Sequence, residues 1–362
     1  MNKILKLDWT LLFSVALLLI IGLLILYGVS LGESGAGLGN FKKQLISAFI
    51  GIVLMFSIAF FDYRSLNFFS TKLYFAMLLV LVLVLFFGTE IRGTTGWIGL
   101  GAFNIQPVEV AKLVMIIFLA SFFSKKKSQL SIIVRIITSI ILVFVPIFLI
   151  IKQPDFGSAM IIIFSWAVIL SVSGISRKNL IVLILVGLVL SYASWFVLRP
   201  YQKERLVNFV NPYNDPRGSG YNVIQSMVAV GSGGIVGKGL GHGSQSQLNF
   251  LPEKHTDFIF AVVAEELGFL GAATVLFLLG LVLYRIKETA RFASDNFGYL
   301  LAIGVMVAFF SQSLVNIGMN IGIMPVAGVP LPLLSYGGSS LVAVLASIGV
   351  VQSVYSHRIR IE

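Results

Sequence analysis

The chain has 362 residues, of which 57% are hydrophobic and 11% are charged, and its formal net charge is +11. This composition excludes an ordinary soluble globule, because many apolar runs of about twenty residues are long enough to cross a hydrocarbon core of ~30 Å. The absence of cysteine excludes disulfides, thiolate metal sites and thiol nucleophiles. The sequence therefore predicts a polytopic membrane protein made of helices.

Ten apolar runs predict an all-α fold with ten transmembrane helices in a single membrane domain, residues 1–362. The first run follows Lys3 and Lys6 and is long enough to be a retained anchor instead of a cleaved signal peptide. The predicted spans are residues 11–30, 45–61, 73–88, 108–123, 131–151, 158–173, 179–198, 257–283, 299–319 and 335–355.

Lysine and arginine are concentrated in every second connection, for example 125–127 and 285–291, and cytoplasmic loops carry an excess of these residues. The bias predicts that both termini lie in the cytoplasm. The net positive charge is then a topology signal combined with attraction to anionic lipid, and it needs no nucleic-acid partner.

Three outer segments are unusual. Residues 199–256, between the seventh and eighth spans, form a long outer loop in which Val223, Met227 and Val230 predict a short amphipathic helix at the surface. Its glycine-rich run 231–243 lacks the spacing of a phosphate-binding loop and is interpreted as a flexible loop.

Residues 89–107 and 320–340 are rich in glycine or proline, which predicts broken or re-entrant backbone around an outer cavity.

Charges are scarce elsewhere but cluster between Glu253 and Glu266, where a polar loop enters the eighth span. Asp257 is the leading candidate for a general base, because an ionisable group at a membrane edge is a functional candidate. It follows Thr256, a good N-cap, and would lie in the first turn of the helix. A capping role alone explains its position at least as well.

Glu265 and Glu266 lie two turns deeper in the same span. Their helical phase differs from that of Asp257, so the three carboxylates cannot line one cavity. We expect at least one of them to pair with a neighbouring span and to hold the bundle together.

Glu109 and Lys112 are spaced to pair on one face at the start of the fourth span. A structural ion pair and an outer anion site, with Lys112, Arg92 and Lys152 supplying positive charge, are both consistent with this spacing. Asp155, before the sixth span, is either a further site carboxylate or an N-terminal helix charge. The three histidines have no metal-ligand spacing.

Several motifs together resemble the SEDS family of cell-wall proteins (shape, elongation, division and sporulation) over nearly the whole chain. They are LDWTLL, FDYRSL, QPVEVAKL, KQPDFGSA, GSQSQLNFLPEKHTDFIFAVVAEELG and NIGMNIGIMPVAGVPLPLLSYGGSSL. The QSQL segment favours the elongation branch over the division branch.

The resemblance implies a peptidoglycan glycosyltransferase that polymerises lipid II on the outer face of the bacterial cytoplasmic membrane for cell elongation and shape. It implies ten spans with both termini cytoplasmic. Its expected partners are lipid II, the growing glycan strand, a class B penicillin-binding protein and other elongation-complex membrane proteins. No cofactor is certain, and a divalent cation, Mg or Mn, is an alternative to protein cations.

The site residues carried over by motif are Asp257, Glu109, Lys112, Asp155, Glu265 and Glu266. Asp257 of HTDF matches the essential family carboxylate, which would act as base while a lipid pyrophosphate leaves. The expected substrate-binding residues are Arg92, Glu109, Lys112, Lys152, Asp155, Lys254 and His255. Expected structural or cavity residues are Trp97, Glu265, Glu266 and Ser335.

The chain departs from the family pattern at two positions. Gly96 precedes Trp97 where the family often has a basic residue, and Val108 stands where serine is usual. A phosphate contact from this loop would then depend on Arg92. Two other functions remain open: a lipid II flippase, favoured by Glu265 and Glu266 at mid-depth, and a non-catalytic activator of the penicillin-binding protein.

Overall fold

The computed structural model describes residues 6–31, 37–91, 93–101, 103–125, 131–194, 196, 203–204, 207, 209–216, 220–248 and 250–358. Arg92 lies outside these ranges. Within them the helices are α1 (Trp9–Leu31), α2 (Gly37–Phe60), α3 (Arg64–Phe87), α4 (Pro107–Ser124), α5 (Ile132–Lys152), α6 (Phe156–Val172), α7 (Arg177–Ser194), η2 (Pro212–Asn214), α9 (Tyr221–Ser232), α10 (Ser244–Gln247), α11 (Ile259–Arg291), α12 (Asn296–Asn320) and α13 (Gly338–Ser356).

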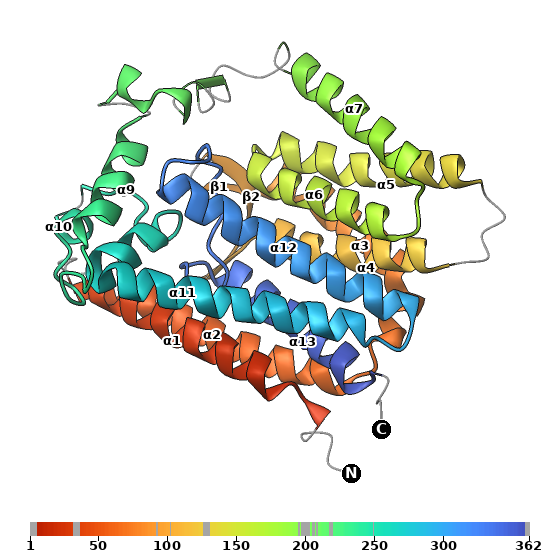
Figure 1. The fold of residues 1–362 in the computed structure, drawn as a ribbon, viewed down its shortest axis with the longest axis horizontal. Helices are drawn as coiled ribbons and strands as arrows, with labels where there is room; N and C mark the ends of the chain where they lie inside the picture. The colour runs from red at the N-terminus through yellow and green to blue at the C-terminus, as the bar shows by residue number, and fades with distance from the viewer. Residues whose placement is uncertain are drawn as a thin grey trace.

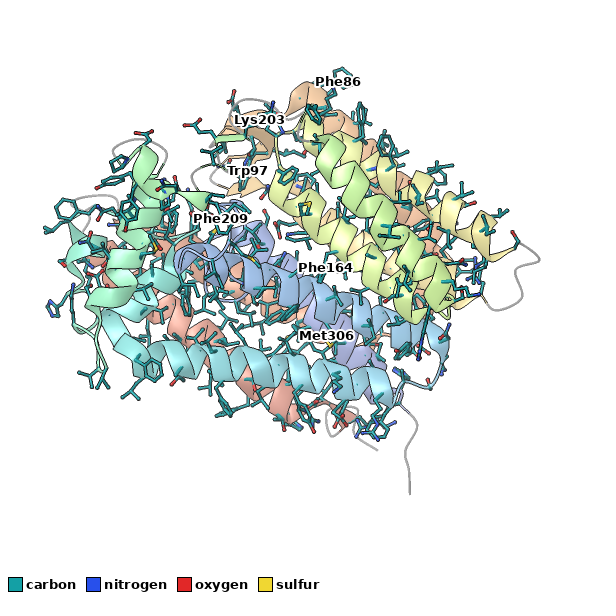
Figure 2. All side chains as sticks on the ribbon, turned by 45° about the horizontal axis from the view of Figure 1, so that its top comes forward. Phe86, Trp97, Phe164, Lys203, Phe209 and Met306 are labelled. Atoms are coloured by element: carbon teal, nitrogen blue, oxygen red, sulfur yellow. The ribbon has the colours of Figure 1, made fainter. Side chains whose placement is uncertain are left out.

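Long helices overlap each of the predicted spans in the described part of the chain. Eight of these described helices are long and apolar enough to cross a membrane, and α6 is a shorter apolar helix of 17 residues. Large apolar side chains cover their outer surface: Phe86 of α3 is 77% exposed and points outward, whereas Met306 of α12 lies within the bundle (Figure 2). Such an apolar exterior suits contact with lipid chains.

The helices run side by side, with α11 and α12 crossing the centre of the view and α1, α2 and α13 along one side (Figure 1). Close approach depends on small residues, as is common between membrane helices. A Cβ atom at Gly349 of α13 would lie 2.5 Å from the Met55 carbonyl oxygen of α2. The core is continuous through these contacts and contains buried residues of both elements, such as Met55 and Leu345.

The two ends of the bundle differ. At what we call the turn end, short connections join α2 to α3 and α11 to α12, and the start of α1 meets the end of α13 through hydrogen bonds between Asp8 and Gln352. At the opposite loop end lie α9 and α10, the connection from α3 to α4, and residues 321–337 between α12 and α13 (Figure 1).

The all-α prediction is wrong in one segment. Residues 89–105 form a small antiparallel sheet of β1 (Thr89–Ile91), β2 (Thr94–Leu100) and β3 (Phe103–Ile105), in the order β1-β2-β3. Gly93 and Gly101, with φ of +73° and +62°, stand at the two turns, where a left-handed backbone favours glycine. The glycines that suggested a re-entrant segment therefore serve hairpin turns.

Residues 321–337 do contain broken backbone, as predicted. They have no helix or strand, and Val329, Leu331 and Leu334 are buried. The segment reaches the middle of α1, where a Cβ atom at Gly22 would lie 2.7 Å from the Leu334 Cα. Leu333 has a φ of +69°, a conformation that a non-glycine residue holds only when its surroundings enforce it.

The eighth predicted span is more complex than expected. α11 begins at Ile259 and continues to Arg291, and it is kinked at Gly268, whose φ is +67°. The glycine-rich run fills this kink: the amides of Phe269 and Leu270 donate to the carbonyls of Gly234 and Ile235. The interpretation of that run as a flexible loop is therefore wrong, because it satisfies backbone groups that the kink releases.

The predicted amphipathic helix exists as α9, but its environment differs from the prediction. Its most buried residues are Val223, Ser226 and Ala229, which face α11 and α12. Val228 is exposed. The helix is therefore packed on the bundle and does not simply lie on a surface.

Candidate active site

Asp257 lies in a turn of residues 252–258 that precedes α11, and it is partly buried. The predicted N-cap is wrong: α11 begins two residues after Asp257, and the Thr256 hydroxyl donates to the Glu253 carbonyl instead of capping the helix. The Ala261 amide at the helix start donates to the Asn320 side chain, at 3.0 Å. A tertiary contact supplies the cap that the sequence seemed to offer locally.

Two amides of α12 hold the backbone of Asp257. The Nδ2 atoms of Asn316 and Asn320 each lie 2.9 Å from the Asp257 carbonyl oxygen. Neither asparagine was singled out from the sequence. The available signal was a pair of amide side chains one helical turn apart in an apolar span.

The irregular segment before α13 closes the other side of this turn. The Ser335 hydroxyl donates to the Thr256 carbonyl at 2.6 Å, and the Tyr336 amide donates to the His255 carbonyl at 2.8 Å. A Cβ atom at Gly328 would lie 3.7 Å from a carboxylate oxygen of Asp257. The carboxylate thus faces the backbone of residues 321–337.

Lys254 is buried, with its ammonium 2.6 Å from the Ser246 carbonyl oxygen. This bond joins α10 to the turn that carries Asp257. The predicted substrate-binding residues Lys254 and His255 are therefore adjacent to Asp257 and are also tied into the surrounding backbone.

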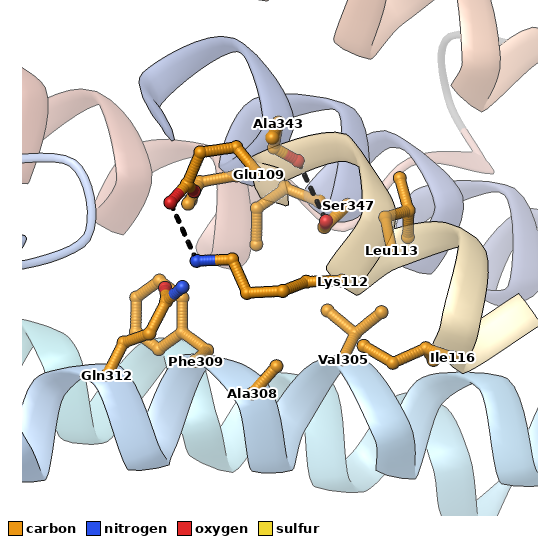
Figure 3. A pocket seen from close by; sticks show the side chains of 12 residues that line it. Glu109, Lys112, Leu113, Ile116, Val305, Ala308, Phe309, Gln312, Ala343 and Ser347 are labelled. Atoms are coloured by element: carbon orange, nitrogen blue, oxygen red, sulfur yellow. Dashed lines mark hydrogen bonds and ion pairs between the residues drawn. The ribbon is translucent and has the colours of Figure 1, made fainter. Parts of the chain in front are cut away.

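Glu109 and Lys112 form a buried ion pair near the start of α4, with the ammonium 2.8 Å from Glu109 Oε1. Their side chains are 3% and 6% exposed. Figure 3 shows the pair at a small cavity of about 30 Å³, with Gln312 and Phe309 of α12 opposite. Within the part of the chain that the structure describes, Glu109 Oε2 has no hydrogen-bond partner. A cavity of this size has room for a water molecule beside the pair.

Asp155 is the N-cap of α6. Its Oδ1 accepts from the Ser158 amide at 2.9 Å, and its Oδ2 accepts from Gln106 Nε2 at 3.2 Å. Burial raises the pKa of this carboxyl, although the Ser158 amide and the Lys112 charge act in the opposite direction. Gln106, the N-cap of α4, therefore links Asp155 to the helix that carries the ion pair.

Hydrogen bonds connect the amino-terminal ends of four helices at the loop end. Ser339 of α13 accepts from the amide of Gln106, the N-cap of α4, and Gln106 reaches Asp155 at the start of α6. Ser335, before α13, bonds to Thr256, before α11. Because helix amino termini carry partial positive charge, this arrangement creates a field that favours an anionic group.

The remaining predicted residues lie at different places. Trp97 of β2 is partly buried, and its indole donates to Thr94 Oγ1 at 3.0 Å. Lys152, the last residue of α5, is exposed, and its ammonium lies 5.4 Å from the centre of the Phe148 ring. The structure therefore does not place Lys152 beside the buried ion pair.

Glu265 pairs with a loop residue and not with a neighbouring span, contrary to our expectation. Its Oε1 lies 2.9 Å from the Lys238 ammonium, and it also accepts the amides of Gln245 and Ser246. Glu266 is also fully buried, and the Ser246 hydroxyl lies 3.5 Å from its Oε1. Both glutamates hold the outer loop against the kink in α11.

Among the described residues no group of three or more histidine, cysteine, aspartate or glutamate side chains could hold a metal ion. Three carboxylates of the expected site have other neighbours. Glu109 contacts the Lys112 ammonium, Asp155 accepts from the Ser158 amide and the Gln106 side chain, and Asp257 faces the backbone of residues 321–337. These donors do not fit a divalent cation held by protein side chains alone.

The sequence and the fold both match known proteins. The model of the FtsW/RodA/SpoVE family, described as cell cycle proteins, matches residues 8–360, and the chain belongs to this family. The peptidoglycan glycosyltransferase MrdB of Escherichia coli is 38% identical over 353 residues, covering 97% of this chain and 94% of MrdB.

Two solved structures share the fold. One comes from work on the structural coordination of polymerization and crosslinking by a peptidoglycan synthase complex. It matches with a TM-score of 0.80 and 36% identity, covering 96% of this chain and 97% of that one. The rod shape determining protein RodA of Thermus thermophilus matches with a TM-score of 0.73 and 30% identity, covering 98% of both chains.

Proposed function

We propose that this chain is a peptidoglycan glycosyltransferase that polymerises lipid II, with Asp257 as the general base. The observation that carries the proposal is the meeting of a held carboxylate, a buried ion pair and four helix amino termini at one end of a membrane bundle. Two relatives of this chain, MrdB of Escherichia coli and RodA of Treponema pallidum, are named peptidoglycan glycosyltransferases.

The reaction needs one displacement. A sugar hydroxyl of the acceptor attacks the anomeric carbon of the donor, the new glycosidic C–O bond forms, and the bond from that carbon to the pyrophosphate oxygen breaks. The Asp257 carboxylate takes the hydroxyl proton, and the lipid pyrophosphate leaves with the electron pair. A single base on one face gives inversion, so a second catalytic carboxylate is not required.

The loop end supplies the environment for the departing charge. The Lys112 ammonium and the amino termini of α4, α6, α11 and α13 provide positive potential where the pyrophosphate would leave. Glu109 orients the Lys112 ammonium, and Asp155 with Gln106 keeps α4 and α6 together. Arg92 remains a proposed contact. Lys152 has the weakest support among the proposed cations, because it is exposed.

We place all ten long helices across the cytoplasmic membrane, with both termini inside and the loop end facing outward. The lysine and arginine distribution supports this orientation. A class B penicillin-binding protein is the proposed partner, because a structure of similar fold comes from a complex that couples polymerization to crosslinking. The outer segments around α9 and α10 would then face the same compartment as the partner's crosslinking domain.

Lipid transport was favoured by Glu265 and Glu266 at mid-depth, and Glu265 no longer supports it. Glu265 was a candidate for a mid-depth transport site, but its carboxylate is occupied by Lys238 and by two backbone amides. A polymerisation assay distinguishes catalysis by this chain from a non-catalytic role as activator of the penicillin-binding protein.

The test is polymerisation of purified lipid II in detergent by the protein co-purified with a class B penicillin-binding protein whose own transpeptidase is competent. We expect glycan polymer from wild type and none from Asp257→Ala or Asp257→Asn, with both variants retaining the wild-type melting temperature. Polymer from Asp257→Ala at the wild-type rate would overturn the role of Asp257. A folded wild-type complex without polymer that moves lipid II across proteoliposomes would favour transport.

A further inference from the structure

Hydrogen bonds from α12, and not from α11, hold the turn that carries Asp257. Asp257 precedes α11 by two residues, so no intrahelical hydrogen bond fixes its backbone carbonyl. That carbonyl instead accepts two side-chain amides, Asn316 Nδ2 and Asn320 Nδ2, each at 2.9 Å. A carbonyl oxygen has two lone pairs, and both are used by the same helix.

Each asparagine is itself fixed by a further hydrogen bond. Asn316 Nδ2 also donates to the Val329 carbonyl at 2.8 Å, and Asn320 Nδ2 donates to the Asn316 carbonyl at 2.8 Å. Both residues are fully buried. Their amide groups therefore hold one orientation, because a buried amide that turned away would leave polar atoms without partners.

Asn320 joins three elements at this point. Its Oδ1 accepts the Ala261 amide at the start of α11, at 3.0 Å, and its carbonyl accepts the Ser226 hydroxyl of α9, at 2.8 Å. Asn316 joins the Asp257 turn to residue 329 of the irregular segment, close to the Gly328 position that faces the Asp257 carboxylate. The two amides thus set the distance between the carboxylate and the wall opposite.

We propose that Asn316 and Asn320 are positioning residues that fix Asp257 in the geometry required for proton transfer, and that Ser226 links the outer helix α9 to this clamp. The inference rests on the proposed function and deepens it. The asparagines act through Asp257 and do not contact the substrate. Loss of one amide lets the turn shift, and a displacement of about 1 Å at a reacting group can lower a rate by about 10²-fold.

The test is steady-state polymerisation of lipid II by complexes carrying Asn316→Ala, Asn320→Ala or Ser226→Ala. We expect kcat to fall about 10- to 100-fold for either asparagine variant, with KM within about threefold of wild type, because substrate contacts are unchanged. Ser226→Ala should lower kcat less than either. In the double asparagine variant the fold-decrease in kcat should be smaller than the product of the two single fold-decreases, because both amides act on one carbonyl.

The matched control is Ser313→Ala, a buried polar residue on the same helix whose hydroxyl donates to the Phe309 carbonyl of its own helix. Its kcat should stay within about twofold of wild type, since side-chain hydroxyls of this kind have small local effects. Melting temperatures are measured for every complex. Asn316→Asp, which keeps the shape but exchanges the amide donor for a carboxylate, should be as inactive as Asn316→Ala.

Three results would overturn the clamp. They are wild-type kcat in both asparagine variants, an equal loss in Ser313→Ala, or a kcat loss seen only in variants whose melting temperature has collapsed. In each case the wild-type complex still polymerises lipid II, so the proposed function survives. A wild-type complex without activity would instead remove the proposed function and the clamp together.

Discussion

Charged side chains at the turn end of the bundle pair with one another, whereas at the loop end ion pairs stand beside amide and hydroxyl side chains that hold irregular backbone. At the turn end Asp8 forms an ion pair of 2.8 Å with Arg285, and the Tyr63 hydroxyl donates to Asp295 at 2.7 Å. At the loop end Asn316, Asn320 and Ser335 donate to carbonyls of irregular segments.

The difference follows from how the ends are connected. Short turns leave few backbone groups without partners, so charged side chains at the turn end satisfy each other. Burial raises the pKa of Tyr63 to about 12, and Asp295, despite burial, has a lowered pKa because it accepts from the Gly298 amide, Tyr63 and Arg64. Broken backbone at the loop end needs hydrogen-bond donors, and asparagine side chains of α12 supply them. The comparison teaches that substitutions at the turn end should affect stability alone, whereas those at the loop end should also lower activity.

The largest effect is expected at the Glu109–Lys112 pair. Lys112→Met leaves a buried carboxylate without its partner, which should cost about 3–5 kcal/mol of stability. Glu109→Gln combined with Lys112→Met removes both charges and should restore the melting temperature in detergent. Polymerisation should stay lost in the double variant, because the cation is absent. An active double variant would show that the pair is only structural.

At the turn end, Arg285→Ala should cost about 2–3 kcal/mol, because the Asp8 side chain, 1% exposed, loses a charged hydrogen-bond partner. Activity per folded complex should remain at the wild-type level. Arg291→Ala is the control, since Arg291 is 71% exposed and 3.9 Å from Glu288, and it should change stability by less than about 0.5 kcal/mol. A selective loss of activity in Arg285→Ala would contradict the division between the two ends.

Two substitutions at Asp155 separate the effect of its helix cap from the effect of its charge. Asp155→Ala should cost about 1 kcal/mol through the lost cap, whereas Asp155→Asn keeps a good cap. Because the folded-state pKa is raised, the ionised carboxylate destabilises the fold, so Asn should gain stability relative to wild type as the pH rises above about 4. Thermal unfolding at several pH values measures this. Full polymerisation by Asp155→Asn would show that Asp155 acts as a cap only.

The smallest effect is expected for Lys152→Ala. The side chain is exposed and interacts with Phe148, so its removal should cost no more than about 0.5–1 kcal/mol. Lipid II polymerisation should remain within about twofold of wild type, in contrast to the double variant at Glu109 and Lys112. A tenfold rise in KM would restore Lys152 to the substrate site.

Part of this organisation was predictable from the sequence. The helices overlap the apolar runs, often within a few residues, as for α13, predicted at 335–355 and found at Gly338–Ser356. The position of Asp155 at the start of a helix and that of Glu109 beside Lys112 also followed from local spacing. These features depend on residues close in the chain.

Other features depended on contacts that helical spacing does not reveal. The Thr94–Leu100 segment forms a strand in which Trp97 pairs with Thr89 and Ile98 pairs with Ile105. The sequence did not show which cation would pair with Glu265. The glycine-rich run is bonded to α11 at the Gly268 kink, and Lys238 of that run lies 2.9 Å from Glu265. The Asn320 side chain replaced Thr256 as the cap of α11.

The sequence by itself determined the membrane character, the helical segments and the candidate carboxylates, because transfer of apolar runs into lipid and helical spacing are local properties of the chain. Only the tertiary structure decided which partner each polar group has. A buried donor or acceptor must find a partner wherever the packed helices place one, and for Asp257 that partner is a pair of asparagines about 60 residues further along the chain.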